Sequence, residues 1–432
     1  MANEQSSAVN GDTMEKQKGI QISVLDDDDE EQNEQQQEEY ATDEFDDDDE
    51  EEEKEFVTLG FVEKPKTRWS LLRQLFPSKA GGVPAWLDPM NLPSGKSCVC
   101  DICGEPLQFL LQVYAPIEKE YAFHRTLFVF MCLSMSCLRR DQHEQWKRHP
   151  EKPSRSVKVF RCQLPRFNHF YPSEPPRHDG TDKPSGAGAA LCSWCGTWKG
   201  DKLCSSCRTA RYCSEKHQVM HWRSGHKIDC QRMIISSDCP NKNGATSANL
   251  QKGQYRIWFL GLFGWKLQTV SNTLWAEYEM IIENETEFST EMVENNACTN
   301  SLISKEKIDD TMMSHINIEG DEDKKSWASF QECIAKAPEQ VLRYCRDGSA
   351  KPLWPMSSGR PSKADIPKCK YCGGPLCFEF QILPQLLYYF SVKDEVDSLD
   401  WGTIVAYTCE ASCEGNVSYK EEYAWVQHAT LP

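Results

Sequence analysis

The segment CKYCGGPLCFEFQILP, residues 369–384, has a near copy, CDICGEPLQFLLQVYAP, at residues 100–116. When the two are aligned at a constant offset of 269 residues, both cysteines and the Gly, Pro, Leu, Phe and Gln positions coincide. In each copy a Cys-x-x-Cys turn leads directly into an alternating apolar stretch, which is typical of a β-strand. The repeat therefore predicts one β unit with a cysteine turn, used twice in the chain.

Each copy is followed by a second pair of cysteines. The runs TLFVFMC and GTIVAYTC end at Cys132 and Cys409, and Cys137 and Cys413 follow them. Two cysteine turns at the ends of strands are the arrangement of a zinc ribbon, in which four thiolates hold one ion. The alternative is that these turns are kept for packing. The expected ligands are Cys100, Cys103, Cys132 and Cys137 in the first half, and Cys369, Cys372, Cys409 and Cys413 in the second.

Other segments support a β-rich body. The runs LQFLLQVYA, RTLFVFMC and VKVFRCQLP are rich in β-branched and aromatic residues and predict strands. Trp86 and Leu87 are expected core residues, and residues 330–346 are expected to be helical, with a kink or break at Pro338. The predicted fold class is α+β and β-rich, with two related zinc-knuckle β lobes forming a composite body.

A compact Cys/His block lies between the two copies of the repeat, at residues 192–230. Its spacing is C-x2-C-x8-C-x2-C-x5-C-x3-H-x8-H-x3-C, which gives eight candidate ligands. Zinc takes four cysteine or histidine ligands in a tetrahedron, and the Cys-x3-His and His-x3-Cys pairs place two ligands on one face of a short helix. Two closed four-ligand sites indicate structural zinc, because no ligand position remains for a reacting water.

The block resembles the MYND zinc finger, including the YCS segment and the HW…HK…C ending. The resemblance implies interleaved pairs: Cys192, Cys195, Cys213 and His217 at one zinc, and Cys204, Cys207, His226 and Cys230 at the other. The family more often has cysteine where this chain has His217, and His221 is a less suitable competitor. The resemblance also implies proline-containing peptides as partners, although a purely structural role is equally compatible with the sequence.

The acidity of the chain is concentrated in one tract. The whole chain carries a formal charge of −18, whereas residues 26–55 hold 20 acidic residues and one lysine. The rest of the chain is therefore nearly neutral, which disfavours direct binding to nucleic acid. The tract is expected to be disordered, either as a solubilising tail or as a sleeve for a basic partner.

The start of the chain, MANEQSSAVNGDTMEKQ, is polar and unlike a secretory signal. The longest apolar run, IWFLGLFGW, is too short for a membrane helix, so no membrane association is expected. Together with 21 cysteines, this favours metal ligands over disulfides. The remaining cysteines are expected to be ordinary thiols, with Cys98 as a competitor for the first site: Cys98, Cys162, Cys239, Cys298, Cys333, Cys345 and Cys377.

Composition divides the chain into segments. The expected organisation is a disordered acidic tail at 1–55, an N-terminal β lobe at 56–175, a linker at 176–190, a MYND-type finger at 191–231, part of the C-terminal body at 250–283, a disordered insertion at 284–325, and a C-terminal β lobe at 326–432.

Several segments in this order resemble the programmed cell death protein 2 family, from Val57 to Gln427 apart from the insertion. They are VTLGFVEKP, SKAGGVPAWL, CDICGEPLQFLLQVYAP, FHRTLFVFMC, the Cys/His block, APEQVLRYCR, KPLW and the second copy of the repeat. The long acidic tract resembles a plant-style or lineage-specific extension.

The resemblance implies a non-enzymatic role in ribosome biogenesis. Members of the family act as dedicated chaperones for a basic small-subunit ribosomal protein and support rRNA and 40S maturation. They are found in cytoplasm and nucleus, and the protein is expected to be monomeric.

The alternative function is a MYND-dependent adaptor in transcription, chromatin or cell-death and proliferation control. An enzyme is disfavoured because the sequence has no P-loop, GxSxG or HExxH motif. The segment NHFY at Asn168 lacks the cysteine of a methyltransferase Asn-His-x-Cys motif. His124 is expected to be packed or hydrogen-bonded rather than a catalytic base.

Overall fold

The computed structural model describes residues 57–67, 69–147, 154–181, 188–237, 274–288, 321–393, 395 and 397–428. The acidic tract, the apolar run at 257–265, Cys239 and Cys298 lie outside these residues, as do positions 289–320 of the expected insertion.

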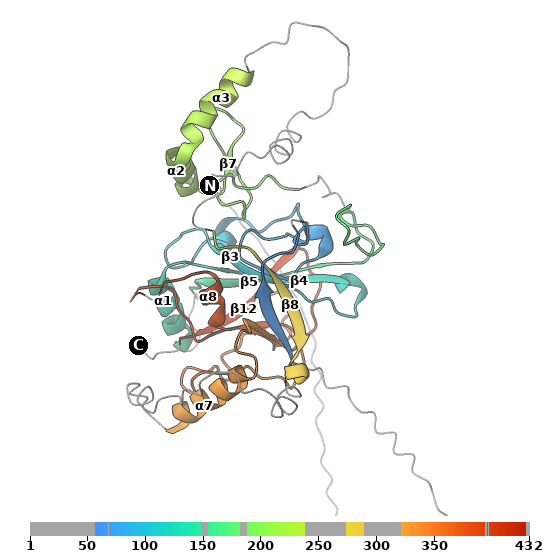
Figure 1. The fold of residues 1–432 in the computed structure, drawn as a ribbon, viewed down its shortest axis with the longest axis vertical. Coiled ribbons are helices and arrows are strands. Elements are labelled where there is room, and N and C mark those ends of the chain that lie inside the picture. The colour runs from blue at the N-terminus through green and yellow to red at the C-terminus, as the bar shows by residue number, and fades with distance from the viewer. Residues whose placement is uncertain are drawn as a thin grey trace, which may run out of the picture. The chain divides into compact units, whose positions relative to one another are not determined.

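Within the described residues, ten strands form one closed antiparallel barrel in the order β1-β8-β2-β3-β4-β5-β12-β11-β10-β9, and β9 pairs back with β1 (Figure 1). The strands are β1 (Thr58–Glu63), β2 (Lys79–Ala80), β3 (Gln108–Tyr114), β4 (His124–Met131), β5 (Val157–Leu164), β8 (Tyr278–Asn284), β9 (Leu342–Tyr344), β10 (Leu376–Ile382), β11 (Thr403–Cys409) and β12 (Tyr419–Gln427).

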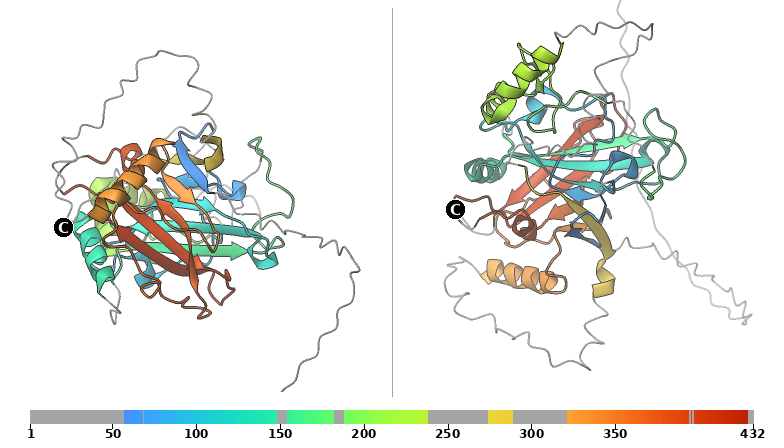
Figure 2. Two further views of the ribbon diagram at one scale, coloured as in Figure 1. Left: turned by 90° about the horizontal axis from the view of Figure 1, so that it is seen from below. Right: turned by 45° about the horizontal axis from the view of Figure 1, so that its top comes forward.

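Helices flank the barrel, as the two views of Figure 2 show. They are α1 (Met135–Trp146), α7 (Asp321–Ala335) and α8 (Gln385–Tyr389), with short 3-10 turns at Arg73–Leu75, Gly95–Cys98 and Glu120–Ala122. The Cys/His block forms β6 (Lys202–Leu203), β7 (Arg211–Tyr212), α2 (Glu215–His221), a π turn at Trp222–His226, and α3 (Lys227–Ser237). No helix in the described part of the chain is long and apolar enough to cross a membrane.

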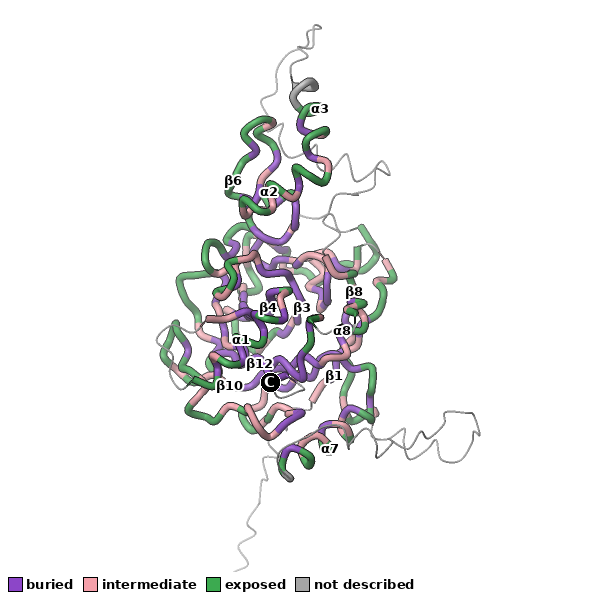
Figure 3. The backbone as a smooth tube through the Cα atoms, turned by 90° about the vertical axis from the view of Figure 1, so that its left-hand side faces the viewer, coloured by how far each residue is buried: buried purple, intermediate pink, exposed green. Residues whose placement is uncertain are grey.

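The expected strands β3, β4 and β5 are confirmed, and so are the core positions Trp86 and Leu87. The expectation of two separate lobes is not confirmed, because both copies of the repeat contribute strands to the same barrel. β5 of the first half pairs with β12 of the second, and one hydrophobic cluster fills the interior. Members of this cluster include Leu110, Leu127, Val129, Phe380, Ile404 and Val426. Figure 3 shows the buried backbone concentrated in these strands.

The repeat is nevertheless visible in the strands. The pairing of β3 with β4 shifts between Phe109 and Leu111, and the pairing of β10 with β11 shifts between Phe378 and Phe380. These positions coincide when the copies are aligned, so both units carry a β-bulge at the same place. A bulge bends a strand locally, which favours the curvature that a closed barrel requires.

The shared glutamines play the same role in both copies. Gln112 accepts a hydrogen bond from the Ala85 amide at 2.8 Å and donates to the Pro77 carbonyl at 2.9 Å. Gln381 accepts from the Leu353 amide at 2.6 Å and donates to the Leu353 carbonyl at 2.8 Å. Each buried amide thus satisfies the backbone of a loop that has no ladder partner of its own.

The expected helix over residues 330–346 is wrong in its second half. Helix α7 ends at Ala335, before Pro338, and Leu342–Tyr344 forms β9 between β1 and β10. Proline cannot continue a helix, and the buried Val341 and Leu342 join the barrel core instead. The expected insertion is also too long, since Asn284 lies in β8 and residues 321–325 lie in α7.

Two buried ion pairs occupy part of the barrel interior. Arg125 lies on the same face of β4 as the core residue Leu127, and its guanidinium contacts the Glu379 carboxylate of β10 at 2.5 and 2.7 Å. Arg161 of β5 contacts Glu422 of β12 at 2.5 Å. All four side chains are buried, and both pairs join the first half of the chain to the second.

Candidate metal centres

Four groups of cysteine and histidine side chains lie close together within the described residues. In each group, the four ligand atoms lie within 4.8 Å of one another. The groups are Cys100, Cys103, Cys132 and Cys137; Cys192, Cys195, Cys213 and His217; Cys204, Cys207, His226 and Cys230; and Cys369, Cys372, Cys409 and Cys413. The structure therefore brings all sixteen expected ligands together in the expected sets.

All four Cys-x-x-Cys turns share one backbone geometry. In the two repeat units, the amides of Gly104 and Gly373 donate to the carbonyls of Cys100 and Cys369, each at 2.9 Å. Both glycines have a positive φ, 74° and 73°, which a side chain would disfavour. In the finger, Gly196 and Arg208 stand at the same position of their turns, and Arg208 adopts φ 53° although it is not glycine.

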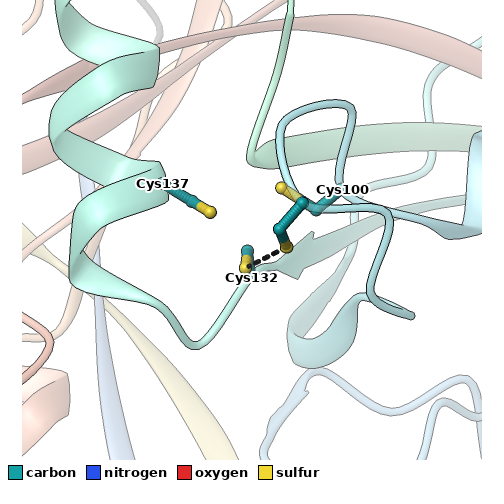
Figure 4. A group of neighbouring side chains, drawn as sticks. Cys100, Cys132 and Cys137 are labelled. Atoms are coloured by element: carbon teal, nitrogen blue, oxygen red, sulfur yellow. Dashed lines mark hydrogen bonds between the residues drawn. The ribbon is translucent and has the colours of Figure 1, made fainter. Parts of the chain in front are cut away.

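The first cluster gathers ligands from three elements. Cys100 and Cys103 belong to the turn before β3, Cys132 follows the end of β4, and Cys137 lies in the first turn of α1. Figure 4 shows Cys100, Cys132 and Cys137 pointing toward one another from these elements. The Cys103 and Cys132 sulfurs are 3.6 Å apart.

The cluster of the second half is held by residues of the first half. Its sulfurs approach at 3.7 Å between Cys369 and Cys413, and at 3.6 Å between Cys372 and Cys409. The Arg161 guanidinium of β5 donates to the Cys413 carbonyl at 3.2 Å and lies 3.8 Å from its sulfur. This cluster is therefore positioned across the seam between β5 and β12.

The finger holds its two clusters around α2 and α3. In the first, the Cys195 and Cys213 sulfurs are 3.9 Å apart, and His217 presents Nδ1 at 3.1 Å from Cys213. In the second, His226 presents Nε2 at 3.6 Å from the Cys207 sulfur. Both histidines therefore direct a ring nitrogen toward cysteine sulfur, as zinc ligands do.

The competing residues lie outside the clusters. His221 bonds through Nδ1 to the Tyr212 hydroxyl at 3.0 Å, and its ring stacks on that of His226. The Cys98 thiol donates to the Pro93 carbonyl at 3.2 Å. Cys162, Cys333, Cys345 and Cys377 are likewise absent from the four groups.

The ligand spacing fits zinc. A Zn–S bond of about 2.3 Å implies a tetrahedral edge of about 3.8 Å between sulfurs. Five ligand pairs in these clusters have sulfur–sulfur distances of 3.6 to 3.9 Å. Hydrogen bonding from Cys132 lowers the pKa of Cys100 to about 5, whereas the same interaction raises the pKa of Cys132. Four thiolates at this spacing repel one another, and a dication is what stabilises them together.

The finger is packed against the barrel through aromatic side chains. The Trp198 indole donates to the Leu107 carbonyl at 2.7 Å, and its ring lies 4.4 Å from that of Phe130. Trp86 donates to the Thr197 carbonyl at 2.9 Å. The Cys/His block therefore shares a hydrophobic cluster with the outer face of β3, β4 and β5.

The residues that support the clusters were not predicted from the sequence. Trp198, Arg125 and Arg161 have no spacing pattern that links them to a cysteine. The one available signal was an arginine within each of the apolar runs RTLFVFMC and VKVFRCQLP, since charged residues are rarely buried unless they are paired.

These features define a class: a closed β-barrel built from a repeated cysteine-knuckle unit, with a MYND-type finger packed on it. Residues 56–178 match the N-terminal domain of Programmed cell death protein 2, residues 324–428 match its C-terminal domain, and residues 192–230 match the MYND finger. The chain belongs to the programmed cell death protein 2 family.

Relatives are similar over most of the chain. Programmed cell death protein 2 of Bos taurus is 36% identical over 381 residues, covering 86% of this chain and 96% of the relative. The Mus musculus protein of the same name is 37% identical over 387 residues, covering 87% and 97%. A more distant match is Probable 20S rRNA accumulation protein 4 of Schizosaccharomyces pombe, 31% identical over 120 residues, covering 24% of this chain and 28% of that protein. No solved structure matches the chain.

Proposed function

We propose that the chain binds four zinc ions, one in each cluster, and that all four are structural. Each cluster supplies four protein ligands, which is the complete coordination of a structural zinc site. When bound, the ion supplies the charge that holds the ligand thiolates together. The surrounding residues hold the ligands in place, as Arg161 does for Cys413.

We further propose that the protein is a non-enzymatic escort for a basic small-subunit ribosomal protein, acting in ribosome biogenesis and rRNA maturation in cytoplasm and nucleus. The observation that carries this proposal is family membership, together with the name of the fission yeast relative, which refers to accumulation of 20S rRNA. A rigid barrel with structural metal sites is suited to holding a partner rather than to chemistry. The escort is proposed to act as a monomer.

The test is affinity capture of the tagged full chain during a brief translation pulse, followed by mass spectrometry. A newly made basic protein of the small subunit should be enriched over its share of total ribosomal protein. The matched control is the double variant Cys103→Ser with Cys372→Ser, which removes one ligand from each barrel cluster and should lose the captured protein. Equal recovery of mature ribosomal proteins of both subunits would contradict the proposal, since it would indicate contact with finished ribosomes.

A second candidate is a MYND-dependent adaptor for proline-containing peptides. It is favoured by apolar side chains that the finger leaves exposed, namely Val219, Trp222 and Ile228. Trp222→Ala would separate the two functions. Loss of transcriptional or chromatin partners with intact ribosomal-protein capture supports the adaptor as an additional activity, whereas a capture experiment that yields only such partners supports the adaptor alone.

A further inference from the structure

Strand β8 is paired unequally on its two sides. Its pairing with β1 runs over six of its seven residues, from Glu279 opposite Glu63 to Asn284 opposite Thr58. Its pairing with β2 covers only Tyr278 and Glu279, because β2 has two residues. The side of β8 that faces β2 is therefore paired only near Tyr278 and Glu279. We call the remainder of that side, along Ile282–Asn284, the notch.

The backbone groups along this notch can be assigned by the alternation of a β-strand. The Glu285 amide donates to the Val57 carbonyl on the β1 side, whereas the Met280 amide donates to the Ser78 carbonyl on the β2 side, both at 3.0 Å. Every second residue points the same way, so Ile282 and Asn284 also direct their N–H and C=O groups away from β1. The Asn284 C=O group begins the helical turn at residues 285–288. Among the described residues, none pairs with the outward N–H and C=O groups of Ile282.

The side chains along the notch are accessible. Ile282 is 42% exposed, although it lies on the same side of the strand as the buried core residue Met280. Glu283 and Asn284 are exposed as well. An apolar residue on an unpaired strand edge is a template for pairing with another extended chain.

The notch carries negative charge. Residues 277–288 hold five glutamates and no lysine or arginine. Glu277 and Glu285 are paired with Lys79 and Arg343. Glu279 accepts a hydrogen bond from the Ser70 hydroxyl at 3.1 Å and stands directly opposite Glu63, and like charges in this position repel each other. A chain that adds here is favoured if it is basic and disfavoured if it is acidic.

We propose that an extended basic segment of a partner protein adds, as a further strand at Ile282–Asn284, to the edge of β8 that no described strand pairs with. Main-chain hydrogen bonds supply affinity in this mode, and the acidic side chains along β8 select a basic partner. The inference rests on the proposed function, because the basic ribosomal client is the partner that this chemistry fits.

The test uses the full zinc-loaded chain and, as the probe, a short fluorescent peptide that alternates lysine and threonine. Ile282→Pro removes the outward N–H, and proline is tolerated on an edge strand when its N–H side faces solvent. We expect this variant to weaken probe binding about tenfold, by loss of one backbone hydrogen bond and by steric exclusion of the added strand. Ile282→Thr, which keeps the N–H, should bind as the parent chain does.

A second measurement leaves the protein unchanged. Two versions of the probe are made, one N-methylated at the odd residues and one at the even residues. Each version lacks the N–H donors of one edge of the extended peptide. Strand addition predicts that N-methylation abolishes binding in one version and not in the other. Equal binding of both versions, or unchanged binding by a folded Ile282→Pro variant, would overturn the inference. Equal affinity for a probe with glutamate in place of lysine would overturn its electrostatic part.

Capture in cells separates this inference from the proposed function. If Ile282→Pro captures the newly made ribosomal protein as well as the parent chain does, the escort function is supported and the β8 edge is not the surface that binds this protein. If the probe binds at the edge but no small-subunit protein is captured, the peptide-binding surface on β8 is supported and the escort function is refuted.

Discussion

Arg125 and Glu379 form a bidentate ion pair inside the barrel, although they come from different halves of the chain. Neither side chain is exposed, and the Tyr344 hydroxyl also donates to Glu379, at 3.0 Å. Arg125 additionally donates to Ser412 at 3.1 Å, within the turn that carries the last two cysteine ligands. One arginine of the first half thus anchors both a strand and a cysteine knuckle of the second half.

Glu379→Gln should therefore destabilise the protein strongly, by about 3–5 kcal/mol, because it leaves the Arg125 charge buried without its counter-ion. Chemical denaturation at neutral pH measures this loss. Glu283→Gln, on the exposed edge, is the control and should change stability by no more than about 0.5 kcal/mol. Similar denaturation midpoints for the two variants would show that water reaches the Arg125–Glu379 pair.

The zinc content of the variants Cys100→Ser and Cys98→Ser distinguishes a cluster ligand from a cysteine two residues away. Cys100 belongs to a cluster, whereas Cys98 bonds to a carbonyl. Elemental analysis of protein purified without chelator should give about four zinc per chain for the parent and for Cys98→Ser, and about three for Cys100→Ser, since three ligands hold zinc poorly. A parent value of two would restrict zinc to the finger and refute the barrel sites.

Gly104→Ala tests the left-handed position of the knuckle. Its φ of 74° disfavours any Cβ, although no neighbouring atom would clash with one. The expected loss is about 1–2 kcal/mol, seen as a lower melting temperature and earlier zinc release. Gly348, which is exposed and lacks a positive φ, is the matched control, and Gly348→Ala should leave both measurements unchanged. Equal behaviour of the two variants would mean that the knuckle adapts to alanine without strain.

Trp198→Ala tests whether the finger is part of the barrel's folding unit. The substitution removes a hydrogen bond to Leu107 and empties the space beside Phe130, at an expected cost of about 3–5 kcal/mol. Differential scanning calorimetry should show the barrel transition moving to lower temperature while zinc content stays unchanged. A shift confined to a separate, small transition would instead identify the finger as an independent domain.

His124 should make stability depend on pH below neutrality. Burial lowers its pKa to about 4, and the ring packs against Phe76 and bonds to the Tyr114 hydroxyl at 3.1 Å. The unfolded chain binds this proton near pH 6.5, so it holds more protons than the folded chain between about pH 6.5 and 4, and stability falls as pH falls through that window.

Between pH 7 and 5, the parent protein should lose about 1–2 kcal/mol through His124. His124→Gln lacks the titrating group, so its stability should fall less over the same range. Urea denaturation at both pH values, with zinc present throughout, gives the comparison. Parallel losses in the two proteins would place the pH dependence elsewhere.

The cluster ligands could be predicted because their signal is local. Cys192–Cys195 and Cys369–Cys372 have the spacing of metal knuckles, and their glycines mark the turn. The strands beside them follow from runs of apolar and β-branched residues. The helix expected over 330–346 failed because apolar periodicity in a short segment does not distinguish a helix from a chain that turns at Pro338 and enters a sheet.

The amino-acid sequence by itself thus determined the repeated knuckle, the cysteines and histidines that gather, and most of the strands next to them, since each depends on residues close together in the chain. Only the tertiary structure decided that the two units share one barrel, that the finger packs on it through Trp198, and that Arg125 and Arg161 cross between halves. The pairings that join the halves, β1 with β8 and β5 with β12, depend on packing between segments that lie more than 200 residues apart. An arginine in an apolar strand is stable only when its partner arrives from the other half.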